Sequence, residues 1–275
     1  MYTQAKKSNG NGKVTLSTLA KCKADGNVFA CITAYDASFA ALVDSAGVDV
    51  VLVGDSLGMV IQGQPTTVPV TVDDMVYHGS LVARGTQRAL LMIDMPFMSY
   101  PSPERALDNA ARLMQEGGAE MVKLEGSGNQ TEIVSYLTSR GVPVCAHLGL
   151  RPQSVHKIGG FKVQGRENKA ALQMIADALE LEQAGADIIL LECVPTGLAK
   201  SITQKVSVPV IGIGAGPDVD GQILVLYDIL DITPGKKPKF AKNFMAETGN
   251  PRAAVEKFVA DVKSGEYPQA EHTFK

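Results

Sequence analysis

Eight short apolar runs, most of them rich in β-branched residues, recur along the chain, with amphipathic segments between most of them. The runs cover residues 28–33, 48–53, 90–93, 121–124, 142–146, 188–191, 210–213 and 223–226. Near-continuous apolar runs are typical of parallel strands buried on both faces, and the intervening segments have the period of crossover helices. Eight such repeats predict a closed (β/α)8 TIM barrel, with a doubly wound open sheet as the alternative.

Glycines that end the amphipathic segments indicate helix boundaries. The predicted helices cover residues 16–23, 36–46, 72–84, 102–116, 131–140 and 167–184, and a last one at 252–264 packs either on its own barrel or on a neighbouring chain. The interval between Ile213 and Ile223 is too short for a crossover helix, so either the seventh unit is abbreviated or the eighth strand is misplaced. We expect one barrel domain over residues 14–275, after a flexible polar N-terminus at 1–13.

Composition excludes several other classes of protein. Hydrophobic residues make up 45% of the chain and charged residues 20%, which supplies a large core, and the formal net charge of −3 gives no basic field for nucleic acid. No apolar stretch has the length of a signal peptide or membrane span, and the four cysteines lack the spacing of a zinc site or a disulfide framework. We expect a cytoplasmic protein with reduced cysteines and neither nucleic acid nor membrane as a partner.

An acidic residue stands at the carboxyl end of four of the apolar runs. These residues are Asp55, Asp94, Glu125 and Glu192. Each alone is more often a helix cap or a solvated turn residue, but the carboxyl ends of barrel strands share one rim. Buried carboxylates need a compensating charge, and clustered carboxylate oxygens are the ligands that magnesium prefers. The pattern therefore predicts a magnesium site at that rim.

Two further polar residues belong to the same predicted rim. Lys123 lies two residues before Glu125 and so points to the same side of its strand, either as an anion ligand or as the partner in an internal salt bridge. His147 ends the fifth run and is either a site residue or a hydrogen-bonded structural residue. His78, inside a predicted helix, and His272, in the tail, receive no role.

Two insertions interrupt the repeat. Residues 58–70 form either a lid over the strand ends or a rigid surface loop, and residues 147–165 could close the opposite side of the mouth. The glycines of IGIGAG at 211–216 stand where barrels often bind phosphate, although glycine there also permits close packing. The basic stretch 236–242 is either a solvated loop or a contact for an anionic substrate tail.

The sequence also resembles the ketopantoate hydroxymethyltransferase family, whose members are also called 3-methyl-2-oxobutanoate hydroxymethyltransferases. The resemblance rests on blocks that run nearly end to end in the family's order: ITAYDASFA, VLVGDSLGMVIQG, TTVPVT, MIDMPFMSY, VKLEG, AHLGLRPQSV, GGFKVQGR, LLECVP, IGIGAG, DGQILVLYD and PKFAKNF. So many distinctive blocks in one order make chance similarity implausible.

This resemblance implies a single-domain barrel of the phosphoenolpyruvate/pyruvate-domain type that acts in pantothenate biosynthesis. It implies transfer of a hydroxymethyl group from 5,10-methylenetetrahydrofolate to 3-methyl-2-oxobutanoate, which gives 2-dehydropantoate through a magnesium-stabilised enolate. The implied partners are this oxoacid, the folate and further copies of the chain in a homo-oligomer, by family resemblance a homodecamer.

The resemblance also assigns roles to single residues. It implies a magnesium site made by Asp55, Asp94 and Glu125. It implies an oxoacid site made by Asp55, Ser56, Asp94, Lys123 and His147. His147 bonds either the carboxylate of the oxoacid or the new hydroxyl group, and Glu192 abstracts the proton.

The chain departs from the family pattern at Ala146, Arg151, Val219 and Tyr227, which flank the expected site and bear on substrate affinity before reaction type. Two other functions remain as alternatives. One is a metal-dependent carbon–carbon lyase of the isocitrate lyase kind, whose KKCGH-like loop is absent from this sequence. The other is a non-catalytic barrel that binds an anionic metabolite or serves as an assembly subunit.

Overall fold

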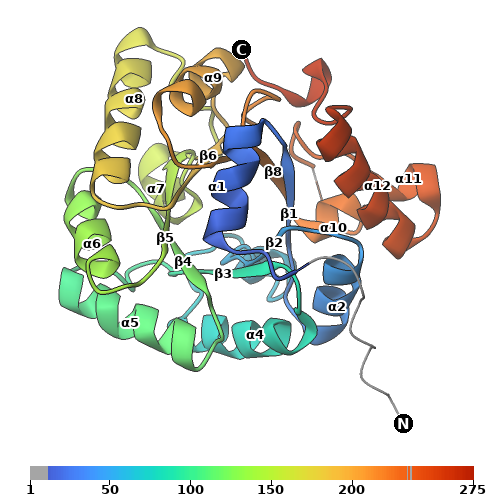
Figure 1. The fold of residues 1–275 in the computed structure, drawn as a ribbon, viewed down its shortest axis with the longest axis horizontal. Coiled ribbons are helices and arrows are strands. Elements are labelled where there is room, and N and C mark those ends of the chain that lie inside the picture. Colours follow the sequence, from blue (N-terminus) through green and yellow to red (C-terminus); the bar gives the residue numbers. More distant parts are fainter. Residues whose placement is uncertain (1–11, 234, 236) are drawn as a thin grey trace.

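Eight parallel strands form one closed barrel in sequence order, and β1 pairs with β8 to complete the ring (Figure 1). The computed structural model describes residues 12–233, 235 and 237–275, so most of the expected flexible N-terminus lies outside the described residues. The strands are β1 (Phe29–Thr33), β2 (Val50–Val53), β3 (Leu90–Asp94), β4 (Met121–Glu125), β5 (Val144–Gly149), β6 (Ile188–Glu192), β7 (Val210–Ile213) and β8 (Gly221–Leu224). The closed ring confirms the predicted (β/α)8 barrel and excludes the open sheet.

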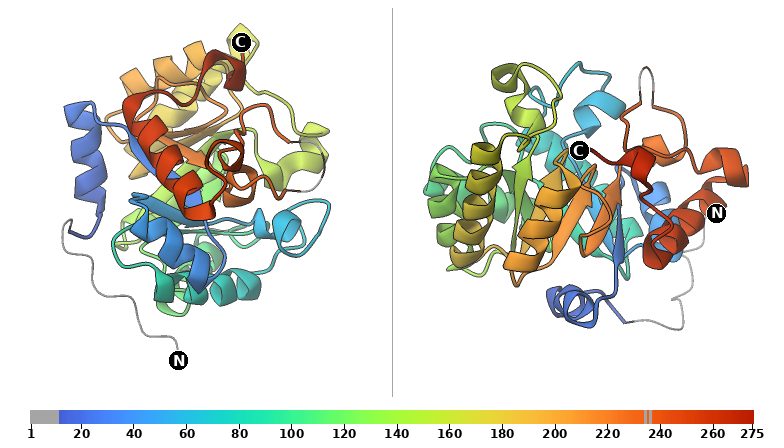
Figure 2. Two further views of the ribbon diagram at one scale, coloured as in Figure 1. Left: turned by 90° about the vertical axis from the view of Figure 1, so that its right-hand side faces the viewer. Right: turned by 90° about the horizontal axis from the view of Figure 1, so that it is seen from above.

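Helices surround the barrel, as Figures 1 and 2 show. The longer ones on the outside are α2 (Ala37–Ser45), α4 (Val72–Gly85), α5 (Pro103–Gln115), α6 (Asn129–Thr138), α8 (Asn168–Gln183), α9 (Thr196–Lys205) and α12 (Pro251–Ser264). The short ones are α3 (Leu57–Val60), η1 (Pro152–Ser154), α7 (Val155–Ile158), α10 (Leu226–Ile229), α11 (Met245–Thr248) and η2 (Ala270–His272). Within the described ranges, none of the helices combines the length and apolar character needed to cross a membrane.

Every second residue of the strands fills the inside of the barrel, as the alternation of strand side chains requires. These buried side chains are Phe29, Cys31, Val50, Leu52, Leu90, Met92, Met121, Cys145, Ile188, Leu190, Ile211 and Ile223. The helix α1 (Leu16–Asp25) covers the amino ends of the strands and buries Leu19 against this cluster (Figure 2). Because that end is covered and the centre is filled, the next inward positions lie at the carboxyl-end mouth.

The eighth strand lies two residues earlier than predicted, at Gly221–Leu224 instead of 223–226. A Cβ atom at position 221 would overlap the ring of Phe29, so glycine is required beside that ring. An apolar pattern cannot reveal a strand that begins with glycine. Leu226 instead begins α10, and no helix separates β7 from β8 in the described segment 214–220, so the seventh unit is the abbreviated one.

Two helices add to the predicted pattern. The helix α9 was not predicted, because no side chain caps its first turn, yet it buries Leu198, Ala199 and Ile202 in the core outside the barrel. The C-terminal helix α12 packs on β1 and α2 of its own chain and buries Phe258. Of the two alternatives for this helix, the structure therefore shows packing on its own barrel.

Candidate active site

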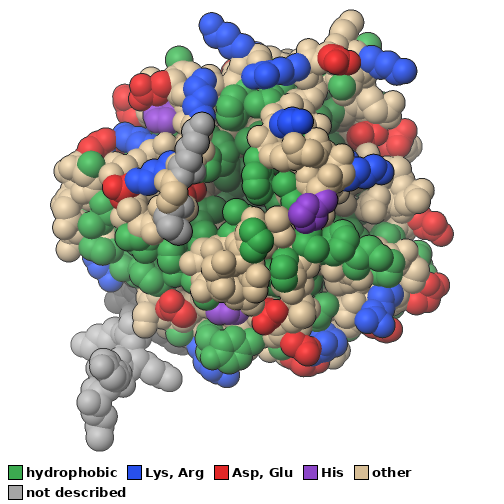
Figure 3. All heavy atoms as spheres, turned by 180° about the vertical axis from the view of Figure 1, so that it is seen from behind, with side chains coloured by type: hydrophobic (Ala, Val, Ile, Leu, Met, Phe, Trp, Pro, Cys, Tyr) green, Lys and Arg blue, Asp and Glu red, His purple; other side chains and the backbone are tan. Residues whose placement is uncertain are grey.

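A cavity of about 640 Å³ opens at the carboxyl ends of the strands. The face of the molecule opposite α1 is hollowed near its middle, with apolar side chains around the hollow (Figure 3). The predicted site residues that line this cavity are Asp55, Ser56, Asp94, Lys123, Glu125, His147 and Glu192. The structure thus brings every one of them together, in a space of the size that small-molecule sites have.

Asp94 and Lys123 form a buried ion pair on neighbouring strands. They are register partners on β3 and β4, and Lys123 Nζ lies 2.8 Å from Asp94 Oδ1. Burial by itself lowers the pKa of Lys123, but the nearby carboxylates, Asp94 first among them, outweigh burial and raise that pKa above its ordinary value. The lysine is therefore charged inside the barrel mouth.

Gln153, in η1, ties two of the carboxylates together. Its Nε2 donates to Asp55 Oδ2 at 2.9 Å and to the Met95 carbonyl at 2.9 Å, and its backbone N–H donates to Glu125 Oε2 at 3.2 Å. The hydroxyl of Tyr100 donates to Gln153 Oε1 at 2.5 Å, which sets the orientation of the amide. Sequence reasoning missed Gln153, because a single glutamine in an irregular insertion gives no signal until the fold places it.

Asp55 follows β2 and lies directly against Asp94. Its backbone N–H donates to Asp94 Oδ2 at 3.0 Å. Burial, and after it the charge of Asp94, raise the pKa of Asp55 to about 7. The next residue, Ser56, shares a hydrogen bond of 2.9 Å with the hydroxyl of Tyr35, which holds the Ser56 hydroxyl at the cavity wall.

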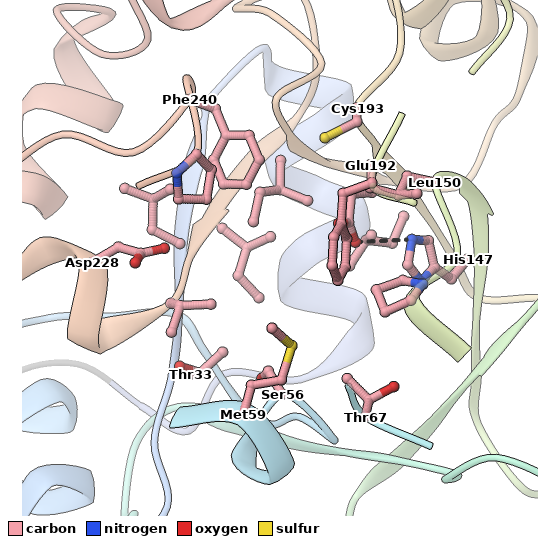
Figure 4. A pocket seen from close by; sticks show the side chains of 18 of the residues that line it. Thr33, Ser56, Met59, Thr67, His147, Leu150, Glu192, Cys193, Asp228 and Phe240 are labelled. Atoms are coloured by element: carbon pink, nitrogen blue, oxygen red, sulfur yellow. Dashed lines mark ion pairs between the residues drawn. The ribbon is translucent and has the colours of Figure 1, made fainter. Parts of the chain in front are cut away.

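His147 lies between Glu125 and Glu192 on the inner face of β5, which runs further than predicted and includes it. Its Nδ1 is 3.6 Å from Glu125 Oε1, and its Nε2 is 3.4 Å from Glu192 Oε2 (Figure 4). Burial, and then the charge of Lys123, hold the pKa of His147 well below its ordinary value, so the ring is neutral. Burial raises the pKa of Glu192 to about 8.

The chemistry of these side chains fits a magnesium ion. Four carboxylates share the mouth with Lys123, and burial raises the pKa of Asp55, Glu125 and Glu192. Apart from its ion pair, Asp94 Oδ1 has no hydrogen-bond partner in the described part of the chain. No three His, Cys, Asp or Glu side chains among the described residues already converge as a metal cage, but magnesium commonly takes one or two carboxylates together with substrate and water.

Both insertions contribute walls of the cavity. Met59 comes from the first insertion and Phe161 from the second, so both insertions line the mouth. The basic stretch predicted at 236–242 contributes Lys237 and Lys239 to the lining, while position 236 lies outside the described residues. The cavity therefore combines a charged floor with an outer part that has apolar walls and a basic edge.

The glycines after β7 serve close packing. A Cβ atom at Gly214 would meet the ring of Phe240 at 2.8 Å, and one at Gly216 would meet Thr196 Oγ1 at 2.7 Å. Neither glycine belongs to the cavity lining. Of the two interpretations of the IGIGAG run, close backbone packing is the one that the contacts support.

The residues that depart from the family pattern lie outside the cavity lining. Ala146 and Val219 are buried in the core between barrel and helices, and Arg151 directly precedes η1. Tyr227 packs its ring against Tyr35, with the centroids 5.8 Å apart. Of these four residues, Arg151 also acts on the site directly, because its positive charge contributes, after burial and Lys123, to the lowered pKa of His147.

The remaining histidines and cysteines have structural roles or none. His78 Nδ1 shares a hydrogen bond of 2.7 Å with the Tyr35 carbonyl, and His272 Nδ1 accepts one of 3.1 Å from the Gln269 backbone. The four cysteines are free, and Cys193, which lines the cavity, has a pKa raised by burial, so it remains a neutral thiol.

Solved structures with the same architecture identify the class of fold. Phosphonopyruvate hydrolase, solved as a complex with oxalate and Mg++, has a TM-score of 0.59 at 15% identity, over 76% of this chain and 80% of that one. 2,3-Dimethylmalate lyase, described as a PEP mutase/isocitrate lyase superfamily member, has a TM-score of 0.56 at 15% identity, also over 76% and 80%. At this identity the likeness shows the fold alone: the chain has the same closed (β/α)8 barrel architecture.

Sequence comparisons identify the family. The ketopantoate hydroxymethyltransferase profile matches residues 13–270. The 3-methyl-2-oxobutanoate hydroxymethyltransferase of Alkalilimnicola ehrlichii is 60% identical over 95% of this chain and 94% of its own length, and that of Halorhodospira halophila is 55% identical over 100% of both. The chain therefore belongs to the ketopantoate hydroxymethyltransferase family. It is a transferase enzyme, which excludes the non-catalytic alternative.

Proposed function

We propose that this enzyme transfers a hydroxymethyl group from 5,10-methylenetetrahydrofolate to 3-methyl-2-oxobutanoate and releases 2-dehydropantoate, as a step of pantothenate biosynthesis. The observation that carries the proposal is the convergence of four acidic side chains and a charged lysine at the carboxyl-end mouth of the barrel. Membership of the family supports the choice of substrates.

We propose that Asp55, Asp94 and Glu125 hold a magnesium ion. Bound there, the ion supplies the Lewis acidity that favours negative charge on the 2-oxo oxygen of the substrate. Lys123, fixed by its ion pair with Asp94, offsets the charge of the substrate carboxylate. Ser56, held at the wall by Tyr35, donates its hydroxyl hydrogen to the same substrate.

Glu192 is the proposed base that removes the hydrogen from carbon 3 of the oxoacid. It lies on β6 at the cavity wall, where His147 Nε2 is 3.4 Å from its Oε2. Its raised pKa of about 8 makes the carboxylate a stronger base than an ordinary glutamate, and the charged form grows as the pH rises toward that value.

The deprotonated carbon then forms a carbon–carbon bond to the methylene carbon of the folate. The two bonds from that carbon to the folate nitrogens break with the electron pairs going to nitrogen, and one water supplies the oxygen of the new hydroxyl group. The nitrogens of the departing tetrahydrofolate take one proton from that water and the proton that Glu192 removed. The cavity of about 640 Å³ is large enough for the second substrate beside a five-carbon oxoacid.

Hydrogen exchange allows the deprotonation of the oxoacid and the transfer from folate to be tested separately. With Mg²⁺ and without folate, we expect the enzyme to exchange the carbon-3 hydrogen of the oxoacid with deuterated water, followed by NMR. Addition of 5,10-methylenetetrahydrofolate should then give 2-dehydropantoate. Absence of exchange would contradict the deprotonation step, and exchange without this product would contradict 5,10-methylenetetrahydrofolate as the donor.

We also propose a cytoplasmic homo-oligomer, a homodecamer, with neither nucleic acid nor membrane as a partner. Sedimentation velocity of the purified enzyme should show a species of decamer mass. A monomer at micromolar concentration would contradict this assembly.

A further inference from the structure

The far side of the cavity, away from Glu192, carries a fifth acidic side chain, which the proposed chemistry does not use. This side is formed by the ends of β7 and β8, by α10 and by the segment that follows it. Ile213, Val225 and Phe240 give it apolar walls, and Asp228 is the carboxylate among them. Figure 4 shows the Asp228 carboxyl group pointing into the cavity from the side opposite His147 and Glu192.

Asp228 is buried and only partly satisfied. Its residue is 4% exposed, and the hydroxyl of Thr233 donates to its Oδ1 at 2.6 Å. Across the described ranges, no other side chain or backbone group bonds its second oxygen, although the residue lines the cavity. A carboxylate that faces a cavity with one oxygen free of protein donors can accept a hydrogen bond from a ligand bound there.

The carboxyl oxygens of Asp228 suit a ligand that donates hydrogen bonds. Burial raises the pKa of Asp228, while the Thr233 hydrogen bond and the positive charge of Lys237 act in the opposite direction. The oxoacid presents only acceptor oxygens and a negative charge, so Asp228 would repel it. The ligand at this position must instead present N–H donors on a flat group that fits between apolar walls.

Of the two proposed substrates, only the folate has such a group. The ring of a pterin carries the N3–H and the 2-amino group side by side, and these match the two oxygens of one carboxylate. We propose that Asp228 binds the pterin ring of the folate donor through these two groups, an inference that rests on the proposed function. Lys237, which pairs with Asp231, and Lys239, which donates to the Thr273 carbonyl, then place positive charge near the carboxylates of the folate tail.

A purely structural role for Asp228 predicts a different result. If its bond with Thr233 only fixes the loop after α10, the loss of Asp228 will impair all reactions of the site in parallel. If Asp228 binds the pterin, its substitution will impair only folate binding and the folate-dependent reaction. The exchange of the carbon-3 hydrogen, which needs no folate, therefore separates the two roles.

The test uses Asp228→Asn in the full-length enzyme, with Asp218→Asn as the matched control in an exposed ion pair with Lys200. We expect Asp228→Asn to lower the affinity for tetrahydrofolate, measured by calorimetry, by roughly 10- to 100-fold, as loss of a charged hydrogen bond does. Folate-dependent turnover should fall far more than folate-free exchange. Equal losses in both reactions, or unchanged tetrahydrofolate affinity, would overturn the assignment.

A second measurement needs no variant and so remains informative if Asp228→Asn does not fold. The wild-type enzyme should bind tetrahydropterin at least roughly tenfold more tightly than the analogue in which a methyl group replaces the 2-amino group. Equal binding of both compounds would exclude the carboxylate contact. If the wild type neither exchanges hydrogen nor uses folate, the proposed function fails first, and this outcome is distinct from a failure of Asp228 alone.

Discussion

At the residue scale, Lys123 sets the charge state of the mouth. Its charge lowers the pKa of Asp55, Glu125 and Glu192, in each case against the larger effect of burial. In return, the carboxylates keep the lysine protonated. A lysine at this position therefore keeps the acids available both as ligands and as a base.

The first prediction concerns this lysine. Lys123→Met removes the charge, so the pKa of Glu192 rises above about 8 and the acid limb of the exchange rate moves to higher pH. The exchange rate at neutral pH should fall at least about tenfold, because a rise of about one pKa unit reduces the charged fraction of Glu192 by that factor. Exchange measured against pH checks this, with the exposed Lys200→Met as a control that should leave the profile unchanged. An unmoved acid limb would contradict the role given to Lys123.

The second prediction concerns the base. Glu192→Gln keeps the shape of the side chain but cannot accept the proton, so exchange of the carbon-3 hydrogen should fall by about 10²- to 10⁴-fold. The melting temperature should not fall, since the variant removes a carboxylate whose side chain is only 16% exposed. Undiminished exchange in deuterated water would refute the assignment of Glu192.

The third prediction concerns Gln153. Gln153→Leu removes the donor to Asp55 Oδ2 and should weaken Mg²⁺ binding roughly 10- to 100-fold, because hydrogen bonds to charged groups contribute about 1.5–3 kcal/mol. Calorimetric titration with Mg²⁺ measures this directly. Gln164→Leu, an exposed change in the same insertion, is the matched control. Wild-type affinity in Gln153→Leu would show that the amide does not support the site.

At the element scale, the alternation of side chains along the strands positions the residues of the candidate site. On β6, Ile188 and Leu190 fill the barrel, and the next inward residue is Glu192 at the mouth. The same spacing on β4 places Lys123 and Glu125 on the inner face. The strands therefore supply packing residues in the centre and chemical groups one step further along, and errors in register would misplace both.

The fourth prediction tests this packing at β8. Gly221→Ala places a methyl group into the ring of Phe29 and should lower the free energy of unfolding by about 1–3 kcal/mol, the usual cost of overpacking. Urea denaturation measures the change. Gly197→Ala in α9, where a Cβ atom meets nothing within 4 Å, is the control. Phe29→Leu in the Gly221→Ala background should recover part of the loss, and no loss at all would contradict the clash.

At the scale of the whole molecule, the residues that stabilise the barrel by packing and the residues of the candidate site lie at opposite ends of the strands. The helix α1 and the packed interior close the amino end, while the carboxyl end gathers buried acids whose pKa values are raised. An acid with a raised pKa keeps its proton in the folded state after the unfolded chain has lost it. Stability from such a group therefore falls as the pH rises between the two pKa values.

The fifth prediction follows from this fall of stability with rising pH. Glu192 has an ordinary pKa of 4.5 and a folded pKa of about 8, so it destabilises the fold increasingly as the pH rises through this range. In a chelating buffer, the melting temperature of Glu192→Gln relative to wild type should therefore increase from about pH 5 to about pH 8. Mg²⁺ should raise the wild-type melting temperature at pH 8. A difference that does not change with pH would contradict the raised pKa.

The sequence by itself determined the barrel, the family and the rim acids, because apolar runs, helix boundaries and residue blocks are local patterns. It could not place β8, because a glycine beside Phe29 breaks the apolar pattern, nor could it predict α9, which lacks a side-chain cap. Only the tertiary structure decided that Gln153 bonds Asp55 and that Asp228 faces the same cavity as Glu192. Those relations join segments far apart in the chain, and they exist only once the ring of strands closes.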